Sequence, residues 1–212
     1  MPLRTGRGRW WSLSVALLAA LTVTAPQAYA DPAVLVYPGM EIRQGTNMCT
    51  LGYVDTGLRI AYSAGHCHGP GPVTDNTGQP IGTTIASLNN TPQGATVSTD
   101  QVISDYQEIA LAPDVAINNI LPGGRSLGSL PAPGLQPGEP VCHFGSVTGE
   151  SCGTVDRVNT GWFTMANGVV SAKGDSGGPV YVVDGDHAVI VGLFNSTWGQ
   201  YPAAVTWPAP AL

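Results

Sequence analysis

The six residues Gly174-Asp175-Ser176-Gly177-Gly178-Pro179 (GDSGGP) carry the strongest signal in the sequence. Glycines on both sides of Ser176 let the backbone adopt unusual conformations and approach a substrate closely. Such a turn can direct several N–H groups at one point, which is what a developing oxyanion requires. Because Gly, Asp and Ser are also common turn residues, a plain surface turn is the alternative. Ser176 is therefore a candidate nucleophile if other segments supply a base and an acid.

A serine hydroxyl is a weak nucleophile unless a base takes its proton. A neutral histidine can do so, because its ordinary pKa of about 6.5 suits proton transfer near neutral pH. Of the four histidines, only His66 follows an apolar, strand-like run (58–64) and precedes a cysteine that could hold it rigidly. His68 opens a Gly/Pro loop, and His143 and His187 are interpreted as a strand residue and a turn residue. We therefore expect His66 to be the base.

A catalytic histidine needs an acid behind it, which fixes the imidazole tautomer and stabilises the imidazolium. Asp105 precedes the apolar run Ile109–Ala112, so a strand of the same half of the chain could carry its carboxylate to the back of His66. The expected set is thus His66, Asp105 and Ser176, in that order along the chain.

Composition favours short strands over helices. Glycine (28) and proline (18) exceed a fifth of the 212 residues, hydrophobic residues reach 43% and charged residues only 10%. No amphipathic helix of three turns is found, and the strand-like runs are 51–54, 58–64, 81–88, 109–112, 153–158, 162–165, 180–183 and 188–194. The segments 55–57 (DTG) and 184–186 (DGD) predict tight turns. The pattern predicts an all-β sandwich or barrel.

The segment Leu121–Pro140 is half glycine and proline. Proline has a restricted φ and no N–H to donate, so this segment cannot be a central strand. It divides the chain into two parts that each contain several strands. We expect an N-terminal β-barrel over 31–120, a linker over 121–137 and a C-terminal β-barrel over 138–212.

The first thirty residues are interpreted as a secretory signal peptide. Arg4, Arg7 and Arg9 precede a largely apolar run (10–25), and Ala28-Tyr29-Ala30 is a small-x-small cleavage site. A membrane anchor is the alternative, but the apolar run is interrupted by Ser and Thr and is shorter than the roughly 20 residues of a span. We expect cleavage after Ala30, export, and no stable membrane insertion.

The net negative charge of the residues after Ala30 argues against anionic binding partners. Five basic and fourteen acidic residues follow Ala30, a net charge of −9, with no cluster of Lys or Arg. Nucleic acid and anionic lipid are poor partners for such a surface.

Four cysteines, Cys49, Cys67, Cys142 and Cys152, accompany the predicted export signal. An even count in an exported chain indicates two disulfides. Three pairings are possible, and pairing in sequence order is the simplest. A zinc site is disfavoured because no Cys-x-x-Cys spacing occurs, so we expect no metal.

Together these motifs resemble the chymotrypsin-fold (trypsin-like) serine proteases of the bacterial secreted kind. The segment GDSGGP matches the family's serine motif letter for letter, and Ser63-Ala-Gly-His-Cys67 is similar to its histidine motif, with Ser where Thr is commoner. The segments 47–54 (NMCTLGYV) and 142–153 (CHFGSVTGESCG) are also similar to segments of bacterial members. The resemblance covers roughly residues 45–200.

The resemblance implies two antiparallel six-stranded β-barrels with the active site in the cleft between them. His66 and Asp105 would come from the first barrel and Ser176 from the second. The backbone N–H groups of Gly174 and Ser176 would form the oxyanion hole. The family pattern also implies the disulfides Cys49–Cys67 and Cys142–Cys152.

The sequence departs from the family pattern around the acid. Gln107 and Glu108 follow Asp105-Tyr106 where the family has mainly small or apolar residues. An ungapped alignment keeps Asp105 as the acid, whereas a shifted alignment puts Glu108 in its place. Asp105 is preferred here, and Asp100 is a third candidate.

The specificity pocket departs as well. Val170 stands where Arg/Lys-cleaving members carry an acid, and Asn195-Ser196-Thr197 stands where a Gly often opens the pocket. We expect Val170, Asn195 and Thr197 to form a shallow pocket for small or medium apolar side chains.

The sequence thus predicts a secreted serine endopeptidase whose serine reacts with a fluorophosphonate probe. We expect a monomer without a cofactor, whose partners are peptide or protein substrates. A catalytically inactive relative that serves as a binding module is the first alternative, because the triad segment and the pocket are unusual. A purely structural disulfide-bonded β protein is the second, and it leaves GDSGGP unexplained.

Overall fold

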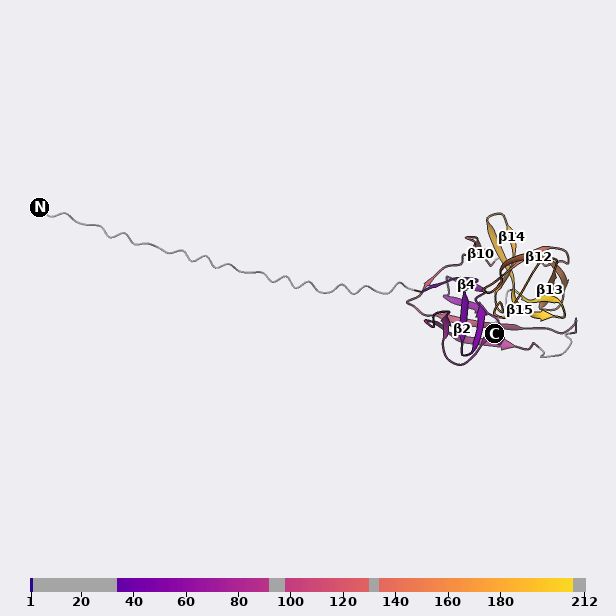
Figure 1. Cartoon of the computed structure of the whole chain (residues 1–212), viewed down its shortest axis with the longest axis horizontal. Coiled ribbons are helices and arrows are strands. Elements are labelled where there is room, and N and C mark those ends of the chain that lie inside the picture. Colours follow the sequence, from indigo (N-terminus) through magenta and orange to yellow (C-terminus); the bar gives the residue numbers. More distant parts are fainter. Residues whose placement is uncertain (2–33, 92–97, 130–133, 208–212) are drawn as a thin grey trace. The chain divides into compact units, whose positions relative to one another are not determined.

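A computed structural model describes residues 1, 34–91, 98–129 and 134–207, which contain strands, turns and no α-helix. The segment Ala33–Leu212 forms one compact unit, whose strands are shown in Figure 1. The predicted signal peptide and its cleavage site lie outside the described residues. Within the described part, no helix has the length and apolarity needed to cross a membrane.

The first sheet has seven strands in the order β3-β2-β6-β7-β8-β5-β4. Its edge strands, β3 and β4, follow each other in the chain and are separated only by Leu51 and Gly52. The sheet therefore curls round on itself without a hydrogen-bonded ladder between its two edges. Its strands are β2 (Glu41–Gln44), β3 (Asn47–Thr50), β4 (Tyr53–Asp55), β5 (Ile60–Ser63), β6 (Val73–Asp75), β7 (Pro80–Asn89) and β8 (Asp105–Leu111).

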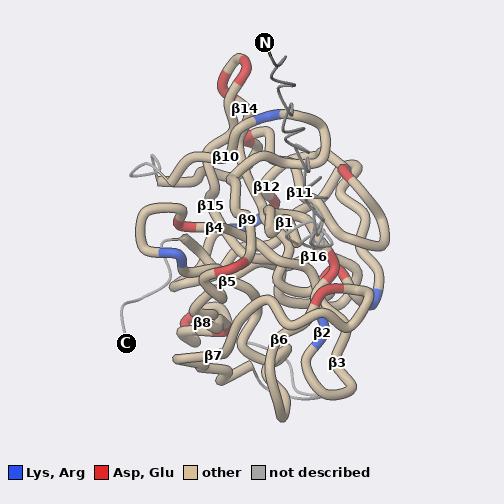
Figure 2. The backbone as a smooth tube through the Cα atoms, turned by 90° about the vertical axis from the view of Figure 1, so that its left-hand side faces the viewer, with Lys and Arg blue, Asp and Glu red and all other residues tan. Residues whose placement is uncertain are grey.

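The second sheet is closed. Six strands run β15-β14-β11-β12-β13-β16, and β16 pairs back onto β15. The strands are β11 (Pro140–Gly145), β12 (Gly149–Val158), β13 (Trp162–Ala166), β14 (Pro179–Asp184), β15 (His187–Trp198) and β16 (Tyr201–Thr206). Figure 2 shows β2, β3, β6, β7 and β8 in one half of the molecule and β10, β11, β12 and β14 in the other.

The all-β, two-barrel fold predicted from the sequence is confirmed, with two differences. The first sheet has seven strands rather than the expected six and is curled but open, and two short pairings of the described strands are parallel rather than antiparallel. These are β1 (Leu35–Val36) with β9 (Ala116–Ile117), and β10 (Ser126–Gly128) with β15. Strand β10 lies in the Gly/Pro-rich segment but at the edge of its sheet, where missing backbone donors are tolerated.

Both predicted tight turns are present. Asp55 closes the turn between β4 and β5 because its Oδ1 accepts hydrogen bonds from the N–H groups of Gly57 (2.9 Å) and Leu58 (2.8 Å). Gly185, with a φ of +58°, turns the chain between β14 and β15, where Asp184 pairs with His187.

Each sheet encloses its own apolar core. The first is lined mainly by aliphatic side chains such as Ile42, Leu51, Val54, Ile81 and Ile109. The second sheet buries Phe163, Met165, Val180, Val191 and Phe194 in one cluster. In the first sheet, burial alternates along strands such as β2 and β5, since successive side chains point to opposite faces. In the second sheet, β13 and β16 are buried at nearly every position.

The structure contains two disulfides, Cys49–Cys67 and Cys142–Cys152, and no free cysteine among the described residues. The first ties the end of β3 to the turn that follows β5. The second links β11 and β12 at two residues that already face each other in the sheet. Both pairs agree with those implied by the resemblance.

Candidate active site

His66 lies in a single 3₁₀ turn, η1 (Gly65–Cys67), that follows β5. The turn is tightly enclosed, because a Cβ added to Gly65 would lie 2.0 Å from the Leu88 carbonyl oxygen. Cys67 is anchored to Cys49 by the first disulfide. These constraints hold the backbone of His66 while 34% of its side chain remains exposed.

Asp105 begins β8 and is fully buried. Its Oδ2 lies 2.6 Å from His66 Nδ1, and its Oδ1 accepts a hydrogen bond of 2.8 Å from the His66 backbone N–H. A carboxylate at this position favours the tautomer with the proton on Nδ1, which leaves Nε2 free to accept another proton. The other candidate acids lie elsewhere: Glu108 faces Tyr62 of β5, and Asp100 accepts a hydrogen bond from Ser98.

Asn195 has a role that the sequence interpretation missed. It lines the cavity, as expected, but it is also buried, and its Nδ2 donates to Asp105 Oδ2 (2.6 Å). The same amide group donates to Thr91 Oγ1 at 2.9 Å. The buried carboxylate of Asp105 is thus held by donors from both sheets. A polar residue that directly follows the apolar run 188–194 was the available signal.

Ser176 follows a tight turn in the chain. Asp175 N–H donates to the carbonyl of Ala172 (3.1 Å), and Gly174, the third residue of this turn, has a φ of +107°. A positive φ at this position is typical of a type II turn and favours glycine. Within the described part of the chain, the N–H groups of Gly174 and Ser176 donate to no protein acceptor.

The Asp175 side chain stabilises this turn through hydrogen bonds. Its buried carboxylate accepts hydrogen bonds from the backbone N–H groups of Val147 (3.0 Å), Thr148 (3.2 Å) and Ala172 (2.7 Å), and from the Thr148 hydroxyl (2.8 Å). These four hydrogen bonds satisfy the buried carboxylate and fix the turn to the segment 147–148. Gly145 is needed here, because an added Cβ would lie 2.1 Å from Asp175 Cγ.

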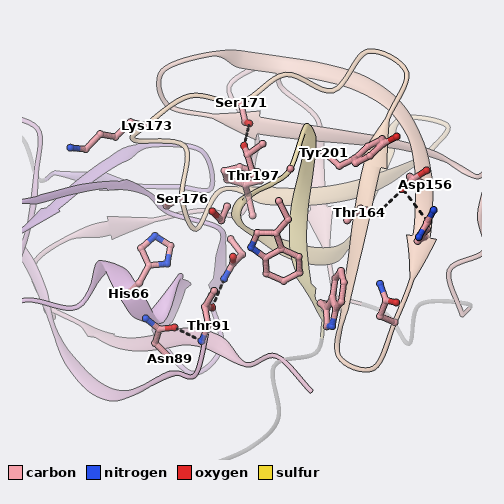
Figure 3. A pocket seen from close by; sticks show the side chains of 18 of the residues that line it. His66, Asn89, Thr91, Asp156, Thr164, Ser171, Lys173, Ser176, Thr197 and Tyr201 are labelled. Carbon is pink, nitrogen blue, oxygen red and sulfur yellow. Dashed lines mark hydrogen bonds and ion pairs between the residues drawn. The ribbon is translucent and has the colours of Figure 1, made fainter. Parts of the chain in front are cut away.

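His66 and Ser176 both line a cavity of about 1150 Å³, and their side chains face the same space in Figure 3. No hydrogen bond joins Ser176 Oγ to the His66 ring among the described residues. Such bonds are often long before substrate binds and shorten in the complex. Residues of both sheets line the cavity, including Asn89 and Thr91 from the end of β7 and Phe194 and Asn195 from β15.

The expected specificity pocket is only partly present. Thr197 lines the cavity and its Oγ1 lies 3.1 Å from Ser171 Oγ, so the two hydroxyls bridge its walls (Figure 3). Val170 does not line the cavity, and 52% of it is exposed. The Val170 N–H donates a hydrogen bond to Ser151 Oγ, and the Val170 carbonyl accepts one from the same hydroxyl. The Val170 side chain contributes nothing to the cavity. The expectation that Val170 makes the pocket apolar was therefore wrong.

The remaining histidines lie apart from the cavity. His143 is fully buried in β11, and its Nδ1 donates a 3.3 Å hydrogen bond to the Pro179 carbonyl. Burial lowers the pKa of His143 to about 4, although the nearby Asp175 carboxylate acts in the opposite direction. His187 Nδ1 lies 2.6 Å from Ser126 Oγ, and His68 is exposed after η1.

Among the described residues, two groups of side chains have the spacing of metal ligands, and each contains a disulfide. They are Cys49, His66 and Cys67, and Cys142, Glu150 and Cys152. A metal-binding cysteine is a thiolate, so sulfurs engaged in disulfides do not provide that ligand.

The chain is similar in sequence to two known proteins. Two proteins of Mycobacterium tuberculosis, the uncharacterized proteins MT1863 and Rv1815, are each 58% identical to the chain over 200 residues, which cover 94% of this chain and 90% of the relative. No protein-family model matches the chain.

Solved structures share the fold. Thermobifida fusca Protease A matches with a TM-score of 0.60 and 22% identity, covering 84% of this chain and 93% of its own. Cellulomonas bogoriensis chymotrypsin matches with a TM-score of 0.56 and 25% identity, over 83% and 92% of the two chains. A scabies mite inactivated protease paralogue also matches, with a TM-score of 0.53 and 16% identity, over 79% and 85%.

The last match shows that this fold occurs in proteins with and without protease activity, so the fold alone does not settle the chemistry. The sequence identity and coverage of the mycobacterial relatives establish kinship, and the two-barrel architecture establishes the fold. The chain therefore belongs to the family of these two mycobacterial proteins and has the fold of the bacterial chymotrypsin-like serine proteases.

Proposed function

We propose that the protein is a secreted serine endopeptidase that hydrolyses peptide bonds through an acyl-enzyme. Ser176 Oγ attacks the substrate carbonyl, and His66 Nε2 takes its proton and later gives it to the leaving amine. Asp105 holds the imidazole and stabilises its charged form. The observation that carries the proposal is the 2.6 Å contact of His66 Nδ1 with the buried Asp105, beside a cavity that Ser176 also lines.

The developing oxyanion would bind the N–H groups of Gly174 and Ser176. Both are free of protein acceptors in the described part of the chain, and the positive φ of Gly174 supports a turn that exposes them. In characterised enzymes, losing one such donor lowers kcat by about 10²–10³.

The decisive experiment is labelling of the purified protein with a fluorophosphonate probe, which reacts with activated serines. We expect the wild type to be labelled at Ser176 and to cleave peptides. Ser176→Ala and His66→Ala should each lower kcat by roughly 10⁶, and the double variant little more, because the groups act as a unit. Absence of labelling in folded wild-type protein would refute the proposal.

An inactive binding module is the second candidate, and two observations favour it. Ser176 and His66 are not hydrogen-bonded to each other in the described structure, and the hydroxyls of Ser171 and Thr197, which both line the cavity, lie 3.1 Å apart. This candidate predicts peptide binding without probe labelling, so the same experiment separates the two functions.

For the endopeptidase, we propose small or medium side chains at the residue before the cleaved bond. Support comes from Thr197 and Ser171, whose hydroxyls meet 3.1 Å apart across the cavity wall. Cleavage of a peptide library measures the preference, and a clear preference for Arg or Lys would contradict it.

We also propose export by a signal peptide over residues 1–30, cleaved after Ala30, and a monomeric protein without a cofactor. The two disulfides support an oxidising compartment. N-terminal sequencing of the protein recovered from culture medium tests the cleavage site.

A further inference from the structure

The break between β3 and β4 is occupied by the turn that carries Ser176. Thr50, the last residue of β3, is fully buried and its N–H donates to the Ser176 carbonyl at 2.8 Å. The next N–H, that of Gly177, donates to the Phe194 carbonyl of β15 at 2.7 Å. The peptide group after Ser176 is thus held at its oxygen by the first sheet and at its nitrogen by the second.

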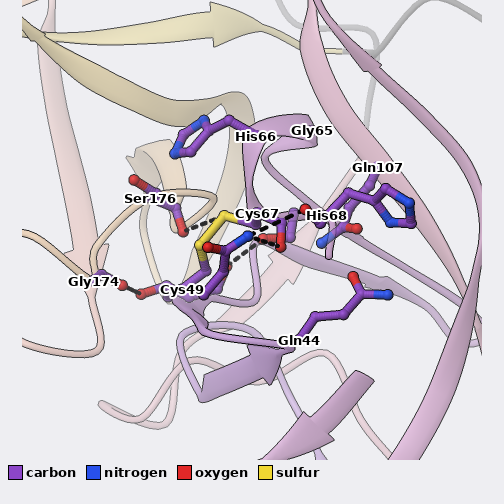
Figure 4. The surroundings of a disulfide bond; sticks show 12 residues. Gln44, Cys49, Gly65, His66, Cys67, His68, Gln107, Gly174 and Ser176 are labelled. Carbon is purple, nitrogen blue, oxygen red and sulfur yellow. Dashed lines mark hydrogen bonds between the residues drawn. A yellow bond between two sulfur atoms is a disulfide. The ribbon is translucent and has the colours of Figure 1, made fainter. Parts of the chain in front are cut away.

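The side chain of Thr50 reaches the other end of the same turn. Its Oγ1 donates to the Gly174 carbonyl at 2.8 Å and accepts a hydrogen bond of 3.0 Å from the Ser146 N–H. The Thr50 carbonyl accepts from Ser63 Oγ at 2.8 Å, which fixes Thr50 itself. Ser176 and Gly174 lie close to the Cys49–Cys67 disulfide in Figure 4, and Cys49 directly precedes Thr50.

These bonds restrict the peptide group that follows Gly174. Its oxygen accepts a hydrogen bond from Thr50 Oγ1 and a longer one, of 3.3 Å, from Ser146 Oγ, and its N–H, that of Asp175, donates to the Ala172 carbonyl at 3.1 Å. A glycine such as Gly174 could otherwise adopt many backbone conformations. With the following peptide group held at both ends, the direction of the Gly174 N–H is constrained as well.

We infer that Thr50 is a positioning residue for the oxyanion-binding turn, supplied by the opposite barrel. Its hydroxyl orients the Gly174 N–H before substrate arrives, and the inference rests on the proposed endopeptidase function. Thr50 does not line the cavity and would not touch the substrate. The sequence marks it only as the residue after Cys49.

The test compares Thr50→Val, which keeps the shape of the side chain but loses the hydroxyl, with Thr50→Ser, which keeps the hydroxyl. For Thr50→Val we expect kcat to fall about tenfold with KM little changed, less than the roughly 10²–10³ for loss of an oxyanion donor. Fluorophosphonate labelling should slow in parallel. Thr50→Ser should recover most of the rate, and the shape of the kcat–pH profile should stay that of the wild type.

The matched control is Thr84→Val. Thr84 Oγ1 lies 3.2 Å from Gln44 Oε1 and from Gln107 Oε1, inside the first sheet and away from the cavity. This variant should lower the melting temperature without changing kcat. Thr50→Ala is the second variant if Thr50→Val does not fold, with the same expected loss of kcat.

The outcomes separate the two claims. If wild-type Ser176 is labelled but folded Thr50→Val or Thr50→Ala keeps wild-type kcat, the positioning role is wrong and the endopeptidase proposal stands. If kcat falls equally in Thr84→Val, the effect is general destabilisation and the positioning role is also wrong. If wild-type Ser176 is not labelled, the endopeptidase proposal itself fails.

Discussion

The two sheets differ in how they close. The second sheet is closed by main-chain hydrogen bonds, because β15 pairs with both β14 and β16. The first sheet ends in β3 and β4, which are joined through Leu51 and Gly52 without forming a ladder with each other. Unpaired edges are usually a liability in a β protein, since they expose donors and acceptors.

Here the unpaired edge contacts the turn of the other sheet that carries Ser176. Gly52 and Gly177 meet at this point, and a Cβ added to Gly52 would lie 2.2 Å from Leu193 Cδ2 and 2.4 Å from the Gly177 oxygen. A Cβ added to Gly177 would lie 2.0 Å from Ser63 Oγ. The closed sheet binds the Ser176 turn through Phe194, and the open sheet binds it through Thr50, so the turn is fixed only where the two sheets meet.

The interiors differ in a related way. The first sheet buries the amides of Gln44 and Gln107, joined through the hydroxyl of Thr84. The second buries His143, whose ring centre lies 4.7 Å from that of Phe194. Buried polar groups are costly unless they are hydrogen-bonded, so both sites make stability sensitive to substitution.

The largest expected effect concerns the acid contributed by the first sheet. Asp105→Asn should lower kcat by about 10⁴, as for the corresponding change in a chymotrypsin-type triad, because the amide favours the wrong imidazole tautomer. Glu108→Gln is the control on the same strand and should change kcat little. Steady-state kinetics with a quenched peptide measure both. The opposite pattern would make Glu108 the acid and overturn the assignment of Asp105.

The next prediction compares the effects of removing the disulfide of each sheet. Replacing Cys49 and Cys67 by Ser should lower the free energy of unfolding by about 3 kcal/mol and also lower kcat, because these residues adjoin Thr50 and His66. Denaturant titration and kinetics measure the two effects.

Replacing Cys142 and Cys152 is the matched control. That bridge joins residues already paired between β11 and β12, so its loss should reduce stability while kcat stays near that of the wild type. Equal losses of kcat in both double variants would show that the two sheets do not differ in this respect.

The contact of Gly52 with the opposite sheet gives a third prediction. Gly52→Ala should lower the free energy of unfolding by about 2–3 kcal/mol, because its Cβ has no space beside Leu193 and the Gly177 oxygen. Probe labelling should slow, since the Ser176 turn is displaced. Gly57→Ala, in the turn after β4, is the control: its nearest neighbour would be Asp55 Oδ1 at 3.4 Å, and stability should change little. Equal thermal stability of the two variants would argue against a close contact of Gly52 with the opposite sheet.

The smallest effect concerns pH and the second sheet. Because burial lowers the pKa of His143 to about 4, the unfolded chain binds a proton at this residue at higher pH than the folded protein does. The stability contribution is present above the unfolded pKa of about 6.5 and is lost as pH falls toward 4. Between pH 7 and pH 5 the loss is on the order of 2 kcal/mol.

Thermal unfolding of the wild type and of His143→Gln between pH 7 and pH 4 measures this loss. The variant should have a flatter pH dependence than the wild type. Parallel curves would show that another group titrates in this range.

Several features were predictable because they depend on local chemistry. The Asp55 turn follows from a side chain that bonds its own backbone, and Gly185 from the need for a positive φ between two adjacent strands. Strands β13 and β14 correspond closely to the apolar runs 162–165 and 180–183. Strand β16 was missed, because Pro202 interrupts its pattern, and the pairing of Pro202 with Thr197 depends on β15.

Side-chain direction in the loops was less predictable. Val170 was placed in the pocket by its distance along the chain from Ser176, yet its backbone is held by Ser151 of a different strand. Asn195 lines the cavity as expected, but its hydrogen bond to Asp105 of the opposite sheet was not predicted. The spacing of residues within one segment does not reveal which hydrogen-bond partners other segments of the chain will provide.

The sequence alone determined the residue types of the candidate triad, their order, and the all-β class, because motifs, turn residues and strand periodicity are local. Only the tertiary structure decided which acid meets His66, because Asp105 and Glu108 lie three residues apart and both lie in β8. It also decided that Thr50 supports the Ser176 turn, because that contact joins residues 124 positions apart whose bonds exist only when both sheets have formed.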